Sequence, residues 1–168
     1  MEQLVINSCN AAGGAPLCPR CGQEGRSVGS VTIESLVSPA ARTRLRSLDG
    51  FRFCATPACD VAYFHPASSE LISCLDVVVP VFQKSTDPGR LVCYCFQHTV
   101  AAIQREVRAT GSSPIATDIK TNCAQGLDDC VHTNPQGSCC LGNVQRVICE
   151  ANGNNQPPPS DGGGCCCH

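Results

Sequence analysis

Cysteine is the feature that most constrains what this chain can fold into, because 16 of its 168 residues are cysteine and most of them stand in short pairs. The pairs read Cys18-Pro-Arg-Cys21, Cys54-Ala-Thr-Pro-Ala-Cys59, Cys93-Tyr-Cys95 and Cys139-Cys140, and Cys130 stands between the last two. Thiolates are strong ligands for soft metals, and a paired spacing places two of them on one ion or cluster. The pattern therefore predicts inorganic chemistry.

A disulfide scaffold is the other usual reason for so much cysteine, and the cellular compartment separates the two explanations. The first residues, Met1 to Asn7, have neither the basic segment nor the apolar run of a signal peptide. No stretch reaches the roughly 18 apolar residues of a membrane span. We therefore expect a cytoplasmic protein whose cysteines bind metal.

Composition supports a metal-stabilised fold and argues against nucleic acid as a partner. The chain has no Trp, two Tyr and five Phe, so its organic core is thin for its length. A structural zinc site can supply roughly 10 kcal/mol to the folding of a small domain. The net charge is −2, and no run of Lys and Arg offers a stripe for phosphates.

Apolar periodicity predicts an α+β protein whose second half is helical. Strands are predicted over residues 28–33, 51–54, 61–64 and 77–82, the last at a sheet edge because of Pro80. A helix is predicted to start at Pro39, with Ser38 as its cap and Asp49-Gly50 as its end. Further helices are predicted over 99–107, around Ile115 and Ile119, and over 141–148, with a turn at 134–137.

The first two cysteine pairs predict a closed zinc site. Cys18 and Cys21 precede Gly22, which suits a tight knuckle, and Cys54 and Cys59 form a wider loop between two predicted strands. Two such pairs about thirty residues apart are typical of tetrahedral four-cysteine zinc, in which no position stays open for water. We therefore expect a structural role for this metal.

The later cysteines predict an iron–sulfur cluster. Cys93 and Cys95 lie on one loop, and Cys139-Cys140 directly precede the last predicted helix, where the positive helix end favours an anionic [2Fe–2S] cluster. Spacing alone does not choose among the other candidates, which are Cys123, Cys130, Cys139 and Cys140. His98 and His132 stand near these cysteines and are alternative ligands of the Rieske kind.

These motifs resemble the CopZ-type N-terminal domain, whose cluster part is similar to the bacterioferritin-associated ferredoxin fold. The resemblance covers about residues 17–150 and lies in the Cys-x-x-Cys, Phe-Cys and Tyr-Phe motifs of the first half, and in Cys-Tyr-Cys with Asn-Pro-Gln-Gly-Ser-Cys-Cys of the second. It implies zinc at Cys18, Cys21, Cys54 and Cys59, and a [2Fe–2S] cluster at Cys93, Cys95, Cys130 and Cys140. Cys130 keeps the family spacing to Asn134-Pro135, and Cys140 abuts the helix; Cys123 and Cys139 are the neighbouring alternatives.

The chain departs from that family because no further domain with a copper-binding Cys-x-x-Cys follows residue 150. The tail Cys165-Cys166-Cys167-His168 is a candidate Cu(I) site that could substitute for it, and the alternative is a tail of thiols without a binding role. We expect one-electron transfer linked to copper handling or chaperoning, with a redox or metal-transport protein as partner, and the pattern favours a redox carrier or metallochaperone over a true enzyme. The alternative is a cluster-based sensor or docking module.

The sequence thus predicts four segments along the chain. They are a flexible arm at 1–16, a zinc-binding unit at 17–84, a [2Fe–2S]-binding unit at 91–150 and a disordered cysteine-rich tail at 151–168. The zinc-binding unit is expected to be ribbon-like and the cluster-binding unit helical.

Overall fold

A four-stranded antiparallel sheet occupies the first half of the chain in the computed structural model, which describes residues 15–154. Its strands pair in chain order and are β1 (Arg26–Ser27), β2 (Arg52–Phe53), β3 (Val61–Phe64) and β4 (Leu71–Ser73). The predicted strands at 51–54 and 61–64 are thus confirmed, and Phe53 lies opposite Tyr63. All four residues of β3 are buried, so β3 is the centre of this half.

Two predicted strands of the first half are wrong. Residues 28–33 were expected to extend, but α1 (Ser30–Leu36) forms there because Thr32, Ile33 and Leu36 bury one helical face. Residues 77–82 make one isolated bridge, from Val77 to Val37. Pro80 has no N–H to donate to a ladder, so the chain leaves the sheet instead.

Short helical turns cover the rest of the first half. The predicted cap is confirmed, because Ser38 Oγ accepts a hydrogen bond of 3.3 Å from the Ala41 N–H at the start of α2 (Pro39–Arg42). This helix ends before the predicted stop at Asp49-Gly50, and Leu45 and Leu48 pack against the core from the turns that follow. Two 3₁₀ turns come later, η1 (Cys74–Asp76) and η2 (Phe82–Lys84).

The second half confirms the three predicted helices and adds elements that the sequence did not predict. The confirmed helices are α3 (Val100–Thr110), α4 (Ile115–Ala124) and α6 (Leu141–Ala151). Thr99 caps α3, and Gly111 ends it in the left-handed conformation. The additions are a hairpin of β5 (Leu91–Cys93) and β6 (His98–Thr99), and the short helix α5 (Cys130–Thr133).

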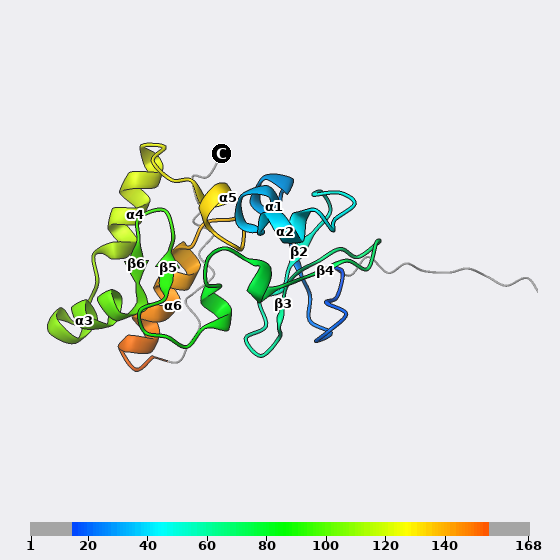
Figure 1. Cartoon of the computed structure of the whole chain (residues 1–168). Coiled ribbons are helices and arrows are strands. Elements are labelled where there is room, and N and C mark those ends of the chain that lie inside the picture. Colours follow the sequence, from blue (N-terminus) through cyan, green and yellow to red (C-terminus); the bar gives the residue numbers. More distant parts are fainter. Residues whose placement is uncertain (1–14, 155–168) are drawn as a thin grey trace, which may run out of the picture.

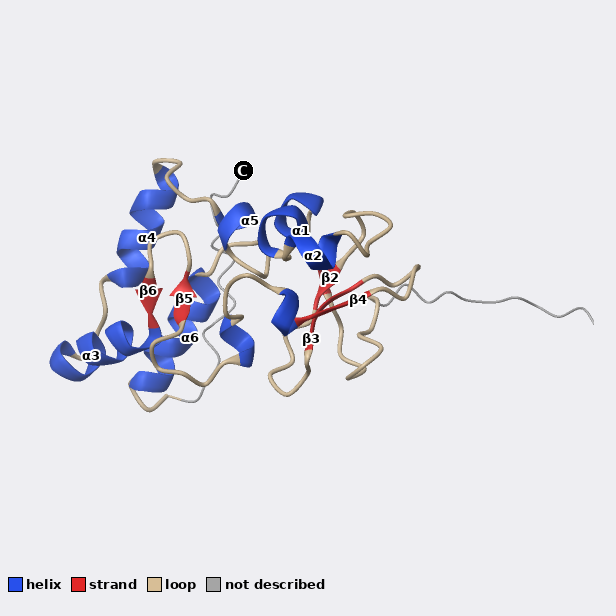
Figure 2. Ribbon diagram, viewed as in Figure 1, coloured by secondary structure: helices blue, strands red, loops and turns tan. Residues whose placement is uncertain are grey.

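The two halves lie side by side, each around its own apolar core (Figures 1 and 2). Val92, Ile103 and Val144 centre the core of the helical half, and Ile33, Phe51 and Tyr63 centre the core beside the sheet. Where the halves meet, α5 packs against α1. This contact brings Cys130, the first residue of α5, next to the sheet half.

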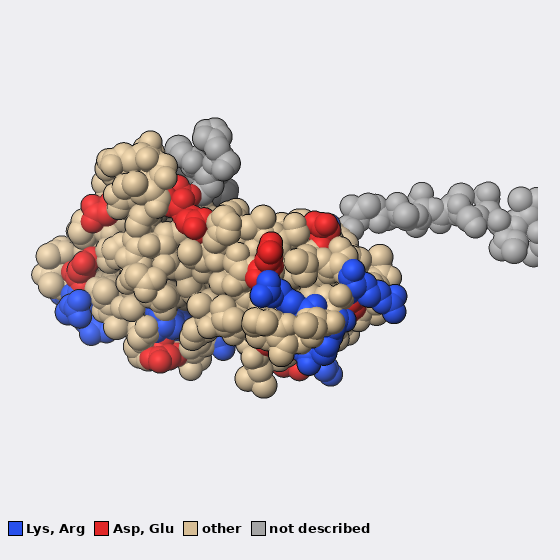
Figure 3. Space-filling view, turned by 45° about the horizontal axis from the view of Figure 1, so that its top comes forward, with Lys and Arg blue, Asp and Glu red and all other residues tan. Residues whose placement is uncertain are grey.

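Lys and Arg gather mainly at the end of the molecule near residue 15, on the face that Figure 3 draws. Over most of that face, acidic and basic side chains stand apart among uncharged ones. Within residues 15–154, none of the helices combines the length and apolar character needed to cross a bilayer.

Candidate metal centres

The first two cysteine pairs sit in two backbone knuckles that face each other. In the first, the Gly22 N–H donates to the Cys18 carbonyl at 2.8 Å, and Gly22 has a φ of 71°, as its predicted knuckle role requires. The second knuckle is the loop between β2 and β3, where the Cys54 N–H donates to the Ala62 carbonyl at 2.9 Å. Each knuckle therefore holds its two thiols in place with ordinary backbone hydrogen bonds.

The four sulfurs of these knuckles converge with the spacing of a tetrahedral zinc site. The Sγ atoms of Cys18, Cys21, Cys54 and Cys59 all lie within 4.8 Å of one another. Cys18 Sγ and Cys59 Sγ are 4.0 Å apart, and Cys21 Sγ and Cys54 Sγ are 3.6 Å apart. A zinc–sulfur bond of about 2.3 Å places the sulfurs of a tetrahedron about 3.8 Å apart. The donor set and its spacing therefore fit zinc.

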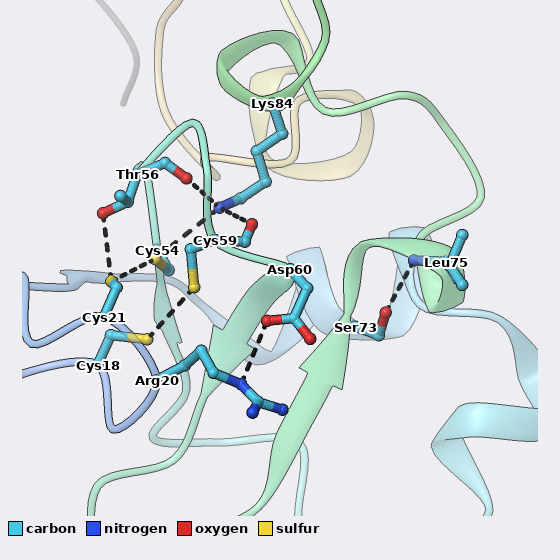
Figure 4. Close-up of polar contacts among 10 residues, drawn as sticks. All are labelled: Cys18, Arg20, Cys21, Cys54, Thr56, Cys59, Asp60, Ser73, Leu75 and Lys84. Carbon is cyan, nitrogen blue, oxygen red and sulfur yellow. Dashed lines mark hydrogen bonds and ion pairs between the residues drawn. The ribbon is translucent and has the colours of Figure 1, made fainter.

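We call the four zinc-site thiols the first sulfur group. Their surroundings shift the pKa values of individual thiols in different directions (Figure 4). A hydrogen bond with Thr56, whose Oγ1 lies 3.3 Å from the Sγ atom, lowers the pKa of Cys21 to about 6. Burial raises the pKa of Cys59 to about 12 and also raises that of Cys18. In the metal-free protein the negative charge therefore concentrates on Cys21.

Lys84, at the end of the 3₁₀ turn η2, contacts the second knuckle. Lys84 Nζ donates to the Thr56 carbonyl at 2.8 Å and to the Cys59 carbonyl at 3.0 Å, and it lies 3.8 Å from Cys54 Sγ (Figure 4). An ammonium group here offsets the negative charge that four thiolates leave on a zinc ion. Spacing along the chain gives no signal for it, because Lys84 stands 25 residues after Cys59.

The second group of cysteines also comes together in space. Cys95 Sγ and Cys130 Sγ are 3.5 Å apart, and the Cys93 and Cys140 side chains share a hydrogen bond. The side chain of Cys139 interacts with those of both Cys130 and Cys140, so the five thiols form one continuous series. Cys123, by contrast, lies on α4 and packs into the helical core.

Charge in this second group concentrates on Cys95 and Cys93, the two ends of the series. The hydrogen bond with Cys130 lowers the pKa of Cys95 to about 6, with help from Thr133 and from the Asp129 N–H, which donates to Cys95 Sγ at 3.2 Å. The contact with Cys140 lowers the pKa of Cys93. Contacts with Cys139 raise the pKa of both Cys130 and Cys140, so these thiols keep their protons in the metal-free protein.

Buried polar side chains fix the loop that carries Cys139 and Cys140. The Gln136 amide donates to the Cys139 carbonyl at 2.7 Å and accepts from Asn143 at 2.9 Å. From the sheet half, the Tyr63 hydroxyl donates to the Pro135 carbonyl at 2.7 Å, and the Thr32 hydroxyl donates to the Val131 carbonyl at 2.8 Å. The roles of Tyr63 and Thr32 do not follow from a sequence motif, because their partners lie 72 and 99 residues away in the chain.

The histidines that were alternative ligands lie at the margins of this group. His98 pairs with Cys93 across the β5–β6 hairpin, and the ring of His132 contacts the carboxylate of Asp129 in an exposed ion pair. The candidate Cu(I) ligands Cys165, Cys166, Cys167 and His168 lie outside the described residues, as do the predicted arm up to residue 14 and most of the predicted tail.

Comparisons with known proteins agree with the zinc assignment and with the fold. Residues 15–77 match the family described as zinc binding domain. The copper chaperone CopZ of Archaeoglobus fulgidus is 29% identical over 130 residues, which are 77% of this chain and 60% of that protein. The X-ray structure of its N-terminal domain superposes with a TM-score of 0.65 at 26% identity, covering 78% of this chain and 96% of that one. The chain thus spans less than two thirds of the curated relative that it matches.

Proposed function

We propose, from the premise that this chain is homologous to the N-terminal domain of the copper chaperone CopZ over 78% of its length, that it is a redox protein of metal handling. Zinc at the first sulfur group has a structural role in this proposal. Four thiolates complete its coordination, so no position remains at which a substrate could bind. The chemistry therefore belongs to the second sulfur group.

The second group is proposed to hold a [2Fe–2S] cluster through Cys93, Cys95, Cys130 and Cys140. The observation that carries this assignment is the continuous series of five sulfurs. Its members come from distant parts of the chain, since Cys95 and Cys130, whose sulfurs are in contact, stand 35 residues apart. Thiolates are the usual ligands of such clusters, and a bound cluster would supply a one-electron couple. Cys139 is the alternative to Cys140, because it contacts the same neighbours.

Residues around this group are suited to a charged centre that exchanges electrons near the surface. The Asp129 N–H points at Cys95 Sγ, and such donors stabilise negative charge on sulfur. Tyr94, between two of the proposed ligands, is 95% buried and keeps water from one side. Cys95 and Cys139 are only half-buried, so the other side of the group approaches solvent.

The proposed reaction is the reduction of Cu(II) to Cu(I), in which the reduced protein loses one electron and the copper ion gains it. Its partner would be a metal-transport or redox protein, as the name of the relative suggests. The sequence Cys165-Cys166-Cys167-His168 supplies soft ligands that suit Cu(I) as cargo.

A second candidate function is a docking or sensing module, which two exposed apolar side chains favour. Leu127 is 58% exposed and Val131 is 46% exposed, and they flank Cys130 on either side along the chain. If the module senses its metal, affinity for a partner should change when the second group is loaded. Equal affinity of the loaded and empty protein would exclude this candidate.

Anaerobic purification followed by metal analysis tests the main proposal. The expected protein contains one zinc and two iron per chain and has the visible absorption of a [2Fe–2S] cluster. Reduction should bleach the absorption, and Cu(II) should restore it with one Cu(I) formed per cluster. A colourless protein with two zinc ions per chain would overturn the cluster assignment.

A further inference from the structure

The segment from Pro80 to Lys84, which we name the strut, touches both sulfur groups. It ends in the 3₁₀ turn η2, which the Lys84 N–H closes by donating to the Val81 carbonyl at 3.0 Å. Val81 and Phe82 are buried, so the strut lies between the two cores.

At its far end, the strut is anchored to the zinc knuckle through Lys84. The ammonium group has three N–H donors, and its neighbours are two carbonyls and a sulfur of that knuckle at 2.8, 3.0 and 3.8 Å (Figure 4). Four thiolates and a zinc ion carry a net charge near −2. The contact with Lys84 is therefore stronger when zinc is bound than when the thiols are protonated.

At its near end, the strut is anchored to the loop of the second sulfur group through Tyr94. The Tyr94 hydroxyl accepts from the Phe82 N–H at 2.9 Å and donates to the Pro80 carbonyl at 2.6 Å. Its neighbours in the chain are Cys93 and Cys95. Gln83 adds a second anchor, because its amide donates to Gln136 at 2.8 Å in the loop that leads to Cys139.

We propose that Lys84 and Tyr94 are positioning residues that couple zinc binding to the conformation of the Cys93–Cys95 loop. Zinc fixes Lys84, Lys84 fixes the strut, and the strut fixes the Tyr94 hydroxyl. Such a coupling is reciprocal, so an ordered loop must also slow the loss of zinc. The proposal requires zinc at the first sulfur group. It does not depend on a metal at the second sulfur group, so it stands or fails independently of the proposed cluster.

Zinc release from the full chain tests the coupling, with a chromogenic chelator as the acceptor. Lys84→Met should speed release about tenfold, the effect of losing charged hydrogen bonds worth roughly 1.4 kcal/mol. Tyr94→Phe, which touches no zinc ligand, should speed release a fewfold. The double variant should release zinc no faster than Lys84→Met alone, because both changes break the same path.

Tyr63→Phe is the matched control for this experiment. It also removes one buried hydroxyl that bonds to a carbonyl, but the partner of this hydroxyl is Pro135, which is not part of the strut. Release from Tyr63→Phe should equal that of the unaltered chain. Equal acceleration by Tyr63→Phe and Tyr94→Phe, or additive effects in the double variant, would overturn the proposal.

Two further readouts separate positioning from general destabilisation. Lys84→Arg keeps a cation and should restore slow release, whereas Lys84→Met should also shift the sulfur-to-cobalt absorption of the Co(II)-substituted protein. Hydrogen exchange in residues 91–97 should rise on zinc removal in the unaltered chain and be already high in Lys84→Met with zinc bound. If hydrogen exchange in residues 91–97 changes neither on zinc removal nor in Lys84→Met, the coupling is refuted.

Discussion

Replacement of Gly137 by Ala should destabilise the protein more than its backbone conformation alone requires. Gly137 ends the turn before Cys139 and has a φ of 65°, where a residue with a Cβ costs about 1–2 kcal/mol. An added Cβ would also lie 3.0 Å from Thr32 Oγ1 and 3.3 Å from Val28 Cγ1. Overpacking of a buried site typically adds about 1–3 kcal/mol. The expected total loss is therefore about 2–5 kcal/mol.

Gly111→Ala is the control that isolates the backbone cost. Gly111 has a φ of 77°, and a Cβ there would meet nothing within 4 Å. Urea denaturation with saturating zinc should show a loss of about 1–2 kcal/mol for Gly111→Ala and a clearly larger loss for Gly137→Ala. Equal losses in the two variants would refute the claim that the sheet half crowds the loop of the second sulfur group.

Three other predictions concern the metal centres. In the metal-free chain at pH 7, Cys21, with its pKa about 6, should be alkylated faster than Cys59, with its pKa about 12. The alkylation rate of Cys21 should fall as the pH drops below 6. Peptide mapping that finds equal alkylation rates for the two thiols would contradict this prediction. Cys139→Ser should retain the visible absorption of the anaerobic protein and Cys140→Ser should lose most of it; the reverse result would exchange their roles. Zinc removal by a chelator should expose the amides of residues 15–77 to hydrogen exchange before those of α3 and α6, and simultaneous exposure would contradict the separate cores.

Local patterns predicted the parts of this structure that depend on neighbours in the chain. The Cys-x-x-Cys-Gly knuckle needs only a glycine at the left-handed position, and Gly22 supplies it. The helices of the second half follow from apolar residues at a spacing of three and four, and Gly111 marks the end of the first of them. The four zinc ligands could be predicted for the same reason, because each pair is fixed by its own loop.

Contacts between distant residues decided the parts that could not be predicted. The β-branched run Val31-Thr32-Ile33 favours a strand by propensity, yet it forms α1. There Thr32 is 1% exposed and bonds to Val131, which lies 99 residues away. Tertiary packing of this kind overrides a weak local preference. The roles of Lys84 and Tyr94 could not be predicted for the same reason, because the fold and not a sequence motif determines their partners.

The second zinc knuckle is also the turn that joins β2 to β3, and this has a consequence for how the sequence can change over time. In most hairpins the turn residues determine the register of the strands. Here two buried thiols, Cys54 and Cys59, anchor both ends of the loop, while Pro57 and Ala58 between them are exposed. Strand alignment therefore depends on the metal ligands, and we expect substitutions at the exposed loop tip to leave it unchanged.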